Sequence, residues 1–195
     1  MTTRPNLLVA TVLPCLIAAC GGRIPEPTPT LSPQEEYSSA VSALLPMLES
    51  WMRADSELTG LMASPVEVGG PAYAMKTTPE EALFDIEVTA GVWPASEVAE
   101  YYRPVMEKLS PSISTITEEG FSLQTQLESM QPPSQVNTYH NEILKCIKSE
   151  MNRARAITEI LTAGTTLRQL DPQACDNWAP SLDGIRAFTS QTVDQ

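Results

Sequence analysis

Apolar residues recur at spacings of three and four along most of this chain, which is the period of an amphipathic α-helix. The first such stretch runs from Ser32 to about Met62. Its opening, Ser32-Pro33-Gln34-Glu35, offers a helix cap, a proline in the first turn and a capping-box glutamate. Pro46 lies inside the stretch and predicts a kink. The expected inward-facing residues are Tyr37, Val41, Leu44, Leu45, Leu48, Trp51, Met52 and Leu58.

The same period predicts three further long helices. We expect one bent helix over residues 96–131, with kinks at Pro104 and Pro111, ended by a pair of prolines. The next is expected to begin with a cap at Ser134 and to stop near Gly164. A last helix should begin with the Asp-Pro pair at 171–172. It would carry Trp178, Leu182, Ile185 and Phe188 on one face.

Two places depart from this simple pattern. Residues 63–78 contain a Gly-Gly pair and two prolines, so we expect a loop there. The stretch at 84–93 alternates as a strand would, but the Thr-Pro-Glu-Glu sequence before it favours a short helix over residues 79–89. Gly120 interrupts the long helix at a cost of about 1 kcal/mol relative to alanine, and the apolar period continues through it.

These elements predict an all-α fold. Four main helices with short connections are typical of a kinked antiparallel bundle. The bundle domain is expected to cover residues 33–195, a length that can bury a sizeable core.

The beginning of the chain predicts export. Residues 7–19 form an apolar run of thirteen, which as a helix would reach about 20 Å, short of the roughly 30 Å hydrocarbon core of a bilayer. These dimensions fit a secretory signal peptide over residues 1–19 better than a transmembrane helix. Arg4 is the one basic side chain before the run.

The run ends in Ile17-Ala18-Ala19-Cys20, which resembles the lipobox of bacterial lipoproteins. The resemblance implies cleavage before Cys20, acylation of its thiol, and attachment of the mature protein to a bacterial cell membrane on its extracytoplasmic side. It covers about the first 22 residues and implies nothing about the folded part. An ordinary signal peptide cut after Ala19, or a buried apolar helix, remains an alternative.

The next segment fits an anchored protein. Residues 20–32 contain three prolines and two glycines, and a fourth proline follows at position 33, which favours an extended, disordered tether. At about 3.1 Å per residue such a tether could span on the order of 40 Å. We therefore expect the membrane to be one partner, through Cys20.

The net charge of the chain argues against one class of partner. The chain has 12 basic and 24 acidic residues, a net charge of −12, and loss of Arg4 with the signal peptide leaves −13. Repulsion from phosphate backbones argues against nucleic-acid binding. Residues 79–130 carry a net charge of −8 and residues 134–170 one of +2. Solvent-exposed helix faces are enough to explain this difference in charge between the two segments. The alternative is an anion-binding patch at Arg153 and Arg155.

Cysteine usage also fits export. Once Cys15 is removed and Cys20 is acylated, Cys146 and Cys175 remain as an even pair in an oxidising compartment. We expect one disulfide between them, with two free buried thiols as the alternative. The disulfide requires the third long helix to stop near Gly164, so that the chain can return towards Cys146.

Candidate chemistry is sparse. His140 is the single histidine, and its spacing from Val136 and Ile143 places it on the core face, where a hydrogen-bonded structural role is the simplest interpretation. A lone histidine cannot supply a di-metal helical site, so we expect no metal, and we find no motif that predicts a cofactor or a catalytic centre. The stretch PPSQVNTYHNEILKCI loosely resembles uncharacterised helical lipoproteins, a resemblance that implies no activity.

The sequence is compatible with two functions. The first is a non-enzymatic, lipid-anchored helical module that binds or scaffolds an unidentified protein or small molecule. The second is a lipid-anchored hydrolase or small-ligand receptor with a site near His140 and Trp93.

Overall fold

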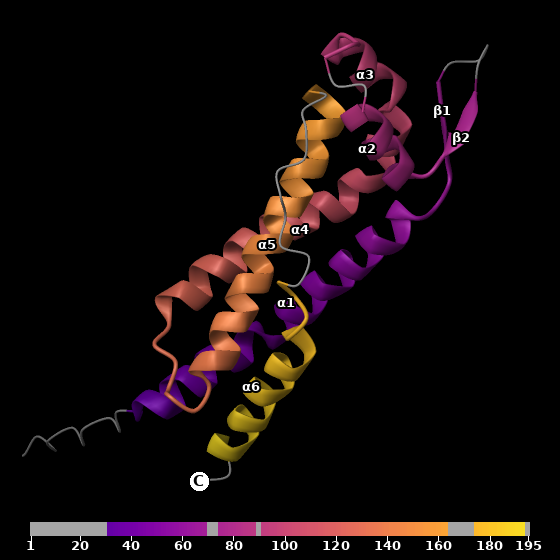
Figure 1. Cartoon of the computed structure of the whole chain (residues 1–195). Helices are drawn as coiled ribbons and strands as arrows, with labels where there is room; N and C mark the ends of the chain where they lie inside the picture. The colour runs from indigo at the N-terminus through magenta and orange to yellow at the C-terminus, as the bar shows by residue number, and fades with distance from the viewer. Residues whose placement is uncertain (1–30, 70–73, 89–90, 164–173, 194–195) are drawn as a thin grey trace, which may run out of the picture. The chain divides into compact units, whose positions relative to one another are not determined.

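Four long helices form the framework of the fold (Figure 1). They are α1 (Pro33–Met62), α4 (Arg103–Ser129), α5 (Asn137–Ala163) and α6 (Trp178–Val193). Between α1 and α4 lie the strands β1 (Val66–Val68) and β2 (Met75–Thr77) and the shorter helices α2 (Pro79–Val88) and α3 (Ala95–Tyr101). The fold is all-α, as the apolar period predicts.

The computed structural model describes residues 31–69, 74–88, 91–163 and 174–193. The expected signal peptide, Cys20 and the tether up to residue 30 lie outside the described residues. The expected return of the chain between Gly164 and the second cysteine lies outside them as well.

The long helices pack as antiparallel neighbours. α1 packs against α4 and α6, and α5 packs against the same two helices. In Figure 1, α4 and α6 run in the opposite direction to α1 and α5. The side chains between the helices are those that the period places inward, and the largest fully buried ones include Leu48, Trp51, Leu109, Ile116, Leu123 and Ile147.

The first helix begins as its sequence predicts. The Ser32 hydroxyl accepts the backbone N–H of Glu35, and the Glu35 carboxylate accepts the backbone N–H of Ser32 at 2.7 Å. This reciprocal pair satisfies two helix-terminal donors. The helix then continues through Pro46, which lies on the exposed side, as one element of 30 residues.

The expected single helix over 96–131 is wrong in its first third. The chain forms α3, breaks at Tyr102, and starts again as α4. Pro104 explains the break, because it has no N–H to donate to the carbonyl of residue 100 and its ring clashes with that carbonyl in a continuous helix. Tyr102 is the hinge (φ −96°, ψ 11°), and its side chain turns into the core. The second proline, Pro111, lies inside α4 without ending it.

The expected loop at 63–78 contains a small antiparallel hairpin. Val66 pairs with Thr77, Glu67 with Lys76, and Val68 with Met75. Val68 and Thr77 are buried, so the hairpin packs one side of its short strands against the helices. The following helix, α2, agrees with the expected short helix at 79–89, and Thr78 and Glu81 form its capping box.

The last two helices start later than predicted. Residues 134–136 form a turn, with the Val136 N–H bonded to the Pro133 carbonyl, before α5 begins at Asn137. The structure describes α5 as far as Ala163, and the expected stop near Gly164 falls on residues outside the described ones. The Asp-Pro pair expected to start the last helix lies outside the described residues, and α6 begins only at Trp178, after a turn over 174–177.

Candidate functional site

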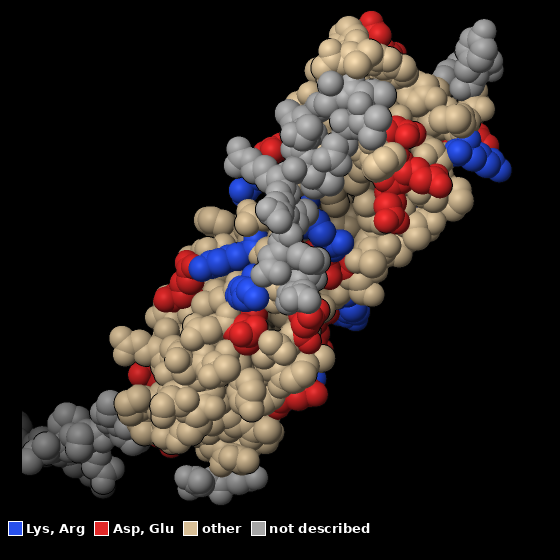
Figure 2. All heavy atoms as spheres, in the orientation of Figure 1, with Lys and Arg blue, Asp and Glu red and all other residues tan. Residues whose placement is uncertain are grey.

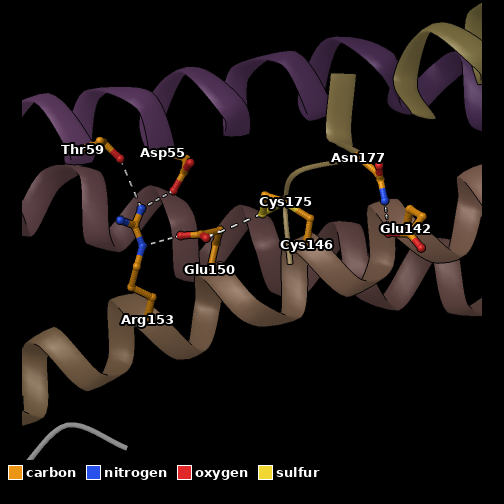
Figure 3. The surroundings of a disulfide bond; sticks show 8 residues. All are labelled: Asp55, Thr59, Glu142, Cys146, Glu150, Arg153, Cys175 and Asn177. Carbon is orange, nitrogen blue, oxygen red and sulfur yellow. Dashed lines mark hydrogen bonds and ion pairs between the residues drawn. A yellow bond between two sulfur atoms is a disulfide. The ribbon is translucent and has the colours of Figure 1, made fainter. Parts of the chain in front are cut away.

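The two cysteines that the sequence pairs lie together beside the middle of α5 (Figure 3). Their sulfur atoms are 1.98 Å apart and their Cα atoms 4.6 Å apart, which joins them in a disulfide. Cys146 is fully buried in α5, and Cys175 is half-buried in the turn before α6. The bond therefore fixes the beginning of α6 to α5.

One helical turn further along α5, a charged cluster joins this helix to α1 (Figure 3). The guanidinium of Arg153 donates through Nη2 to Asp55 Oδ1 at 2.6 Å and through Nε to Glu150 Oε2. The exposed fractions of the Arg153, Asp55 and Glu150 side chains are 27%, 15% and 14%, so solvent screens these ion pairs only in part. Thr59 lies at the edge of the cluster, 3.5 Å from Nη2.

Two carboxylates share one guanidinium in this cluster, and the pKa of one of them, Glu150, is raised. Burial raises the pKa of Glu150 to about 7; Arg153 opposes this shift and the charge of Asp55 adds to it. Glu150 Oε1 also lies 3.6 Å from Cys175 Sγ. Because both carboxylates already engage Arg153, the alternative of an anion-binding patch at Arg153 and Arg155 gains no support here.

His140 lies in the core, as its spacing predicts. Its Nδ1 is 3.1 Å from the Tyr37 hydroxyl, and its ring is hydrogen-bonded to the backbone carbonyl of Leu127. Burial lowers the pKa of His140, and the bond to Leu127 offsets this only in part. A neutral imidazole that donates to the Leu127 carbonyl accepts the Tyr37 proton at Nδ1. Both ring nitrogens are therefore engaged within the fold.

Trp93 lies elsewhere. It precedes α3, is 46% exposed, and packs edge-on against Tyr101 with ring centroids 5.8 Å apart. Figure 1 shows α3 beside the C-terminal end of α5, whereas His140 is in the first turns of that helix. Since α5 has 27 residues, its ends are about 40 Å apart. The structure therefore does not bring His140 and Trp93 into one site.

A groove opens beside Trp93, and of the residues that line it the sequence singled out only Pro104, as a helix kink. It has a volume of about 430 Å³ and is lined by Gly69, Glu97, Glu100, Tyr101, Arg103 and Pro104. The Gly69 N–H donates to the Tyr101 carbonyl at 3.4 Å, which holds the end of β1 against the end of α3. The only sequence signal for this groove is the acidic and aromatic run Glu97–Tyr101 before the helix-breaking proline.

Two further depressions of about 510 and 590 Å³ lie where α1 begins and α4 ends. Their linings are mainly glutamine, serine and proline, with Glu36 as the single charged residue. Neither brings together groups suited to acid–base or nucleophilic chemistry.

The part of the chain that the structure describes contains neither a cluster of metal ligands nor a helix that could span a membrane. No three His, Cys, Asp or Glu side chains of residues 31–69, 74–88, 91–163 and 174–193 approach one another as metal ligands would. None of the helices described combines the length and the apolarity needed to cross a bilayer. Comparison of the chain with models of protein families, with curated proteins and with solved structures finds no match.

Proposed function

We propose that this protein is a bacterial lipoprotein, anchored outside the cytoplasm by acyl groups on Cys20, whose helical domain binds or scaffolds a partner at the membrane surface. The observation that carries the proposal is the apolar run of thirteen residues that ends in Ile17-Ala18-Ala19-Cys20. A proline-rich segment follows directly and could hold the domain away from the lipid. Two or more acyl chains would make the attachment stable.

The disulfide supports the proposed location outside the cytoplasm. Disulfides persist in oxidising environments and are rare in the cytosol of most organisms. The bond between Cys146 and Cys175 joins two elements of the fold, and a cytosolic location would leave it exposed to cellular reductants.

The internal bonding of the polar side chains supports a binding role over a catalytic one. Arg153 is engaged by Asp55 and Glu150, and the ring of His140 is engaged on both sides. A general base or nucleophile needs open access to a substrate. We therefore propose no enzymatic activity for these two clusters.

Metabolic labelling with a fatty acid tests the anchor. We expect the wild-type chain to carry the label and to sediment with membranes, and we expect Cys20→Ala to lose both properties. Cys15→Ala is the matched control, because it removes the other thiol of the same apolar run and should leave labelling intact. An unlabelled wild-type chain, or label retained by Cys20→Ala, would contradict the proposal. A mature chain that begins at an unmodified Cys20 would instead favour ordinary signal-peptide cleavage.

A further inference from the structure

Exposed apolar side chains concentrate at one end of the domain. Seven large hydrophobic residues of the described chain are exposed, and four of them lie between the start of β2 and the start of α3. Phe84 is 65% exposed, Val92 74% and Trp93 46%. Exposed apolar groups on an otherwise polar surface can mark interaction sites, and these four side chains all fall within residues 75–93. The four residues are Met75, Phe84, Val92 and Trp93.

The same end is strongly acidic. Residues 79–101 contain six acidic residues and no basic one. On the face shown in Figure 2, acidic side chains gather over the end where α2 and α3 lie. Two basic residues flank the segment: Lys76 faces Glu67 across the hairpin, and Arg103 lies 3.8 Å from Glu100. An apolar surface with this charge is complementary to a basic, partly apolar partner.

The groove beside Trp93 is a place where a basic side chain of such a partner would fit. Glu97 and Glu100 are three residues apart on α3, so both carboxylates lie on one side of the helix and line the groove with Tyr101. Carboxylates with an aromatic ring alongside suit a guanidinium or an ammonium group. Glu97 forms no ion pair with any described residue. The Arg103–Glu100 contact is highly exposed on both sides (63% and 78%), so an incoming cation can replace it at little cost.

Connectivity favours a protein over a lipid surface as the occupant. The proposed anchoring segment joins the domain at the beginning of α1, and the hairpin follows the end of that helix. The 30 residues of α1 separate the two points by about 45 Å. A surface this acidic is also repelled by anionic lipid headgroups.

We propose that the end formed by β1, β2, α2 and α3 docks a basic, partly apolar segment of a partner protein, with one arginine or lysine side chain in the groove between Glu97, Glu100 and Tyr101. Trp93 and its exposed apolar neighbours cover the rest of that segment. The inference rests on the proposed binding role and does not depend on the lipid anchor.

A peptide-binding experiment tests the surface. The probe is a fluorescein-labelled helical peptide of arginine, leucine and alanine, and its binding to the purified full chain is followed by fluorescence polarisation. Cys20→Ala keeps the chain free of acyl groups in every sample. We expect saturable binding that is weakened roughly tenfold by Trp93→Ala, and to a similar extent by the double variant Glu97→Gln and Glu100→Gln.

Matched controls separate this surface from the general acidity of the chain. Phe121→Ala removes an exposed aromatic side chain from α4 (65% exposed, against 46% for Trp93), and the pair Glu36→Gln and Glu118→Gln makes the same change in charge on α1 and α4. These variants should bind the peptide as the wild type does. Circular dichroism should show the same helix content in all variants, and Trp93→Phe should restore much of the affinity.

Several outcomes would overturn the proposal. They are the absence of saturable binding, equal binding of a peptide with glutamate in place of arginine, and equal weakening by the control variants. The fatty-acid labelling described above reports only on Cys20, so failure of the anchor and failure of the docking surface give different results.

Discussion

Replacing Gly120 by alanine should destabilise the protein, although it improves the local helix propensity. Gly120 is buried in α4, and a Cβ added there would lie 2.9 Å from Nε1 of Trp51 and 2.8 Å from Cγ of Met151. The methionine can shift, because its side chain is flexible. The tryptophan is fully buried, and its Nε1 donates to the Ile116 carbonyl at 3.0 Å, so it cannot move without losing that bond.

The opposing effects can be compared in magnitude. Alanine gains about 1 kcal/mol over glycine inside a helix. Overpacking of a filled core costs about 1–3 kcal/mol, and a buried donor left without its acceptor costs a further ~1–3 kcal/mol. We therefore expect Gly120→Ala to lower the free energy of unfolding by about 1–5 kcal/mol. Urea denaturation followed by circular dichroism should show this as a midpoint lowered by about 1 M at an unchanged slope.

Gly60 provides the matched control. It lies near the end of α1, is exposed, and has no atom within 4 Å of an added Cβ. Gly60→Ala should raise the free energy of unfolding by about 0.5–1 kcal/mol. If Gly120→Ala stabilised the protein as Gly60→Ala does, the close approach of α4 to Trp51 would be refuted.

Three further predictions concern the polar and covalent contacts. Reduction of the Cys146–Cys175 bond, which spans 29 positions, should lower the free energy of unfolding by about 3–4 kcal/mol in urea titrations with and without dithiothreitol; an unchanged midpoint would contradict this. The folded state holds the Glu150 proton more tightly than the unfolded chain, whose pKa is near 4.5, so this residue makes stability fall as the pH rises from about 4.5 to 7. Glu150→Gln should remove that fall from urea midpoints measured across the range, and a variant with the wild-type slope would rule out the buried carboxyl as its cause. Tyr37→Phe should cost about 1–3 kcal/mol, because it leaves Nδ1 of His140 without its donor, and a thermal midpoint equal to that of the wild type would disprove this role.

The apolar period predicted the framework well, because burial on one face of a helix depends mainly on spacing. Positions such as Leu48, Leu109 and Ile147 are fully buried where the period places them inward. The same period concealed the break at Tyr102. Val98, Tyr102 and Val105 keep helical spacing across the break, so only the missing N–H of Pro104 indicates it.

Features set by distant contacts could not be read from the sequence. Glu150 and Arg153 are three residues apart on one helix, and their pairing can be anticipated, but Asp55 precedes Arg153 by 98 positions. The apparent defect at Gly120 is explained only by Trp51 and Met151, which belong to two other helices. The hairpin was missed because three-residue strands are too short to show an alternating pattern.

The distribution of polar contacts indicates where a partner could bind. The middle of the bundle is held by the disulfide and by the Arg153 cluster, and the beginning of α5 is held by the His140–Tyr37 contact. In these places the polar groups bond to one another, so a ligand would have to displace existing interactions. At the hairpin, α2 and α3, apolar and acidic side chains instead face the solvent. A partner could cover this surface without breaking the core, and substitutions there should change binding while leaving the free energy of unfolding nearly unchanged.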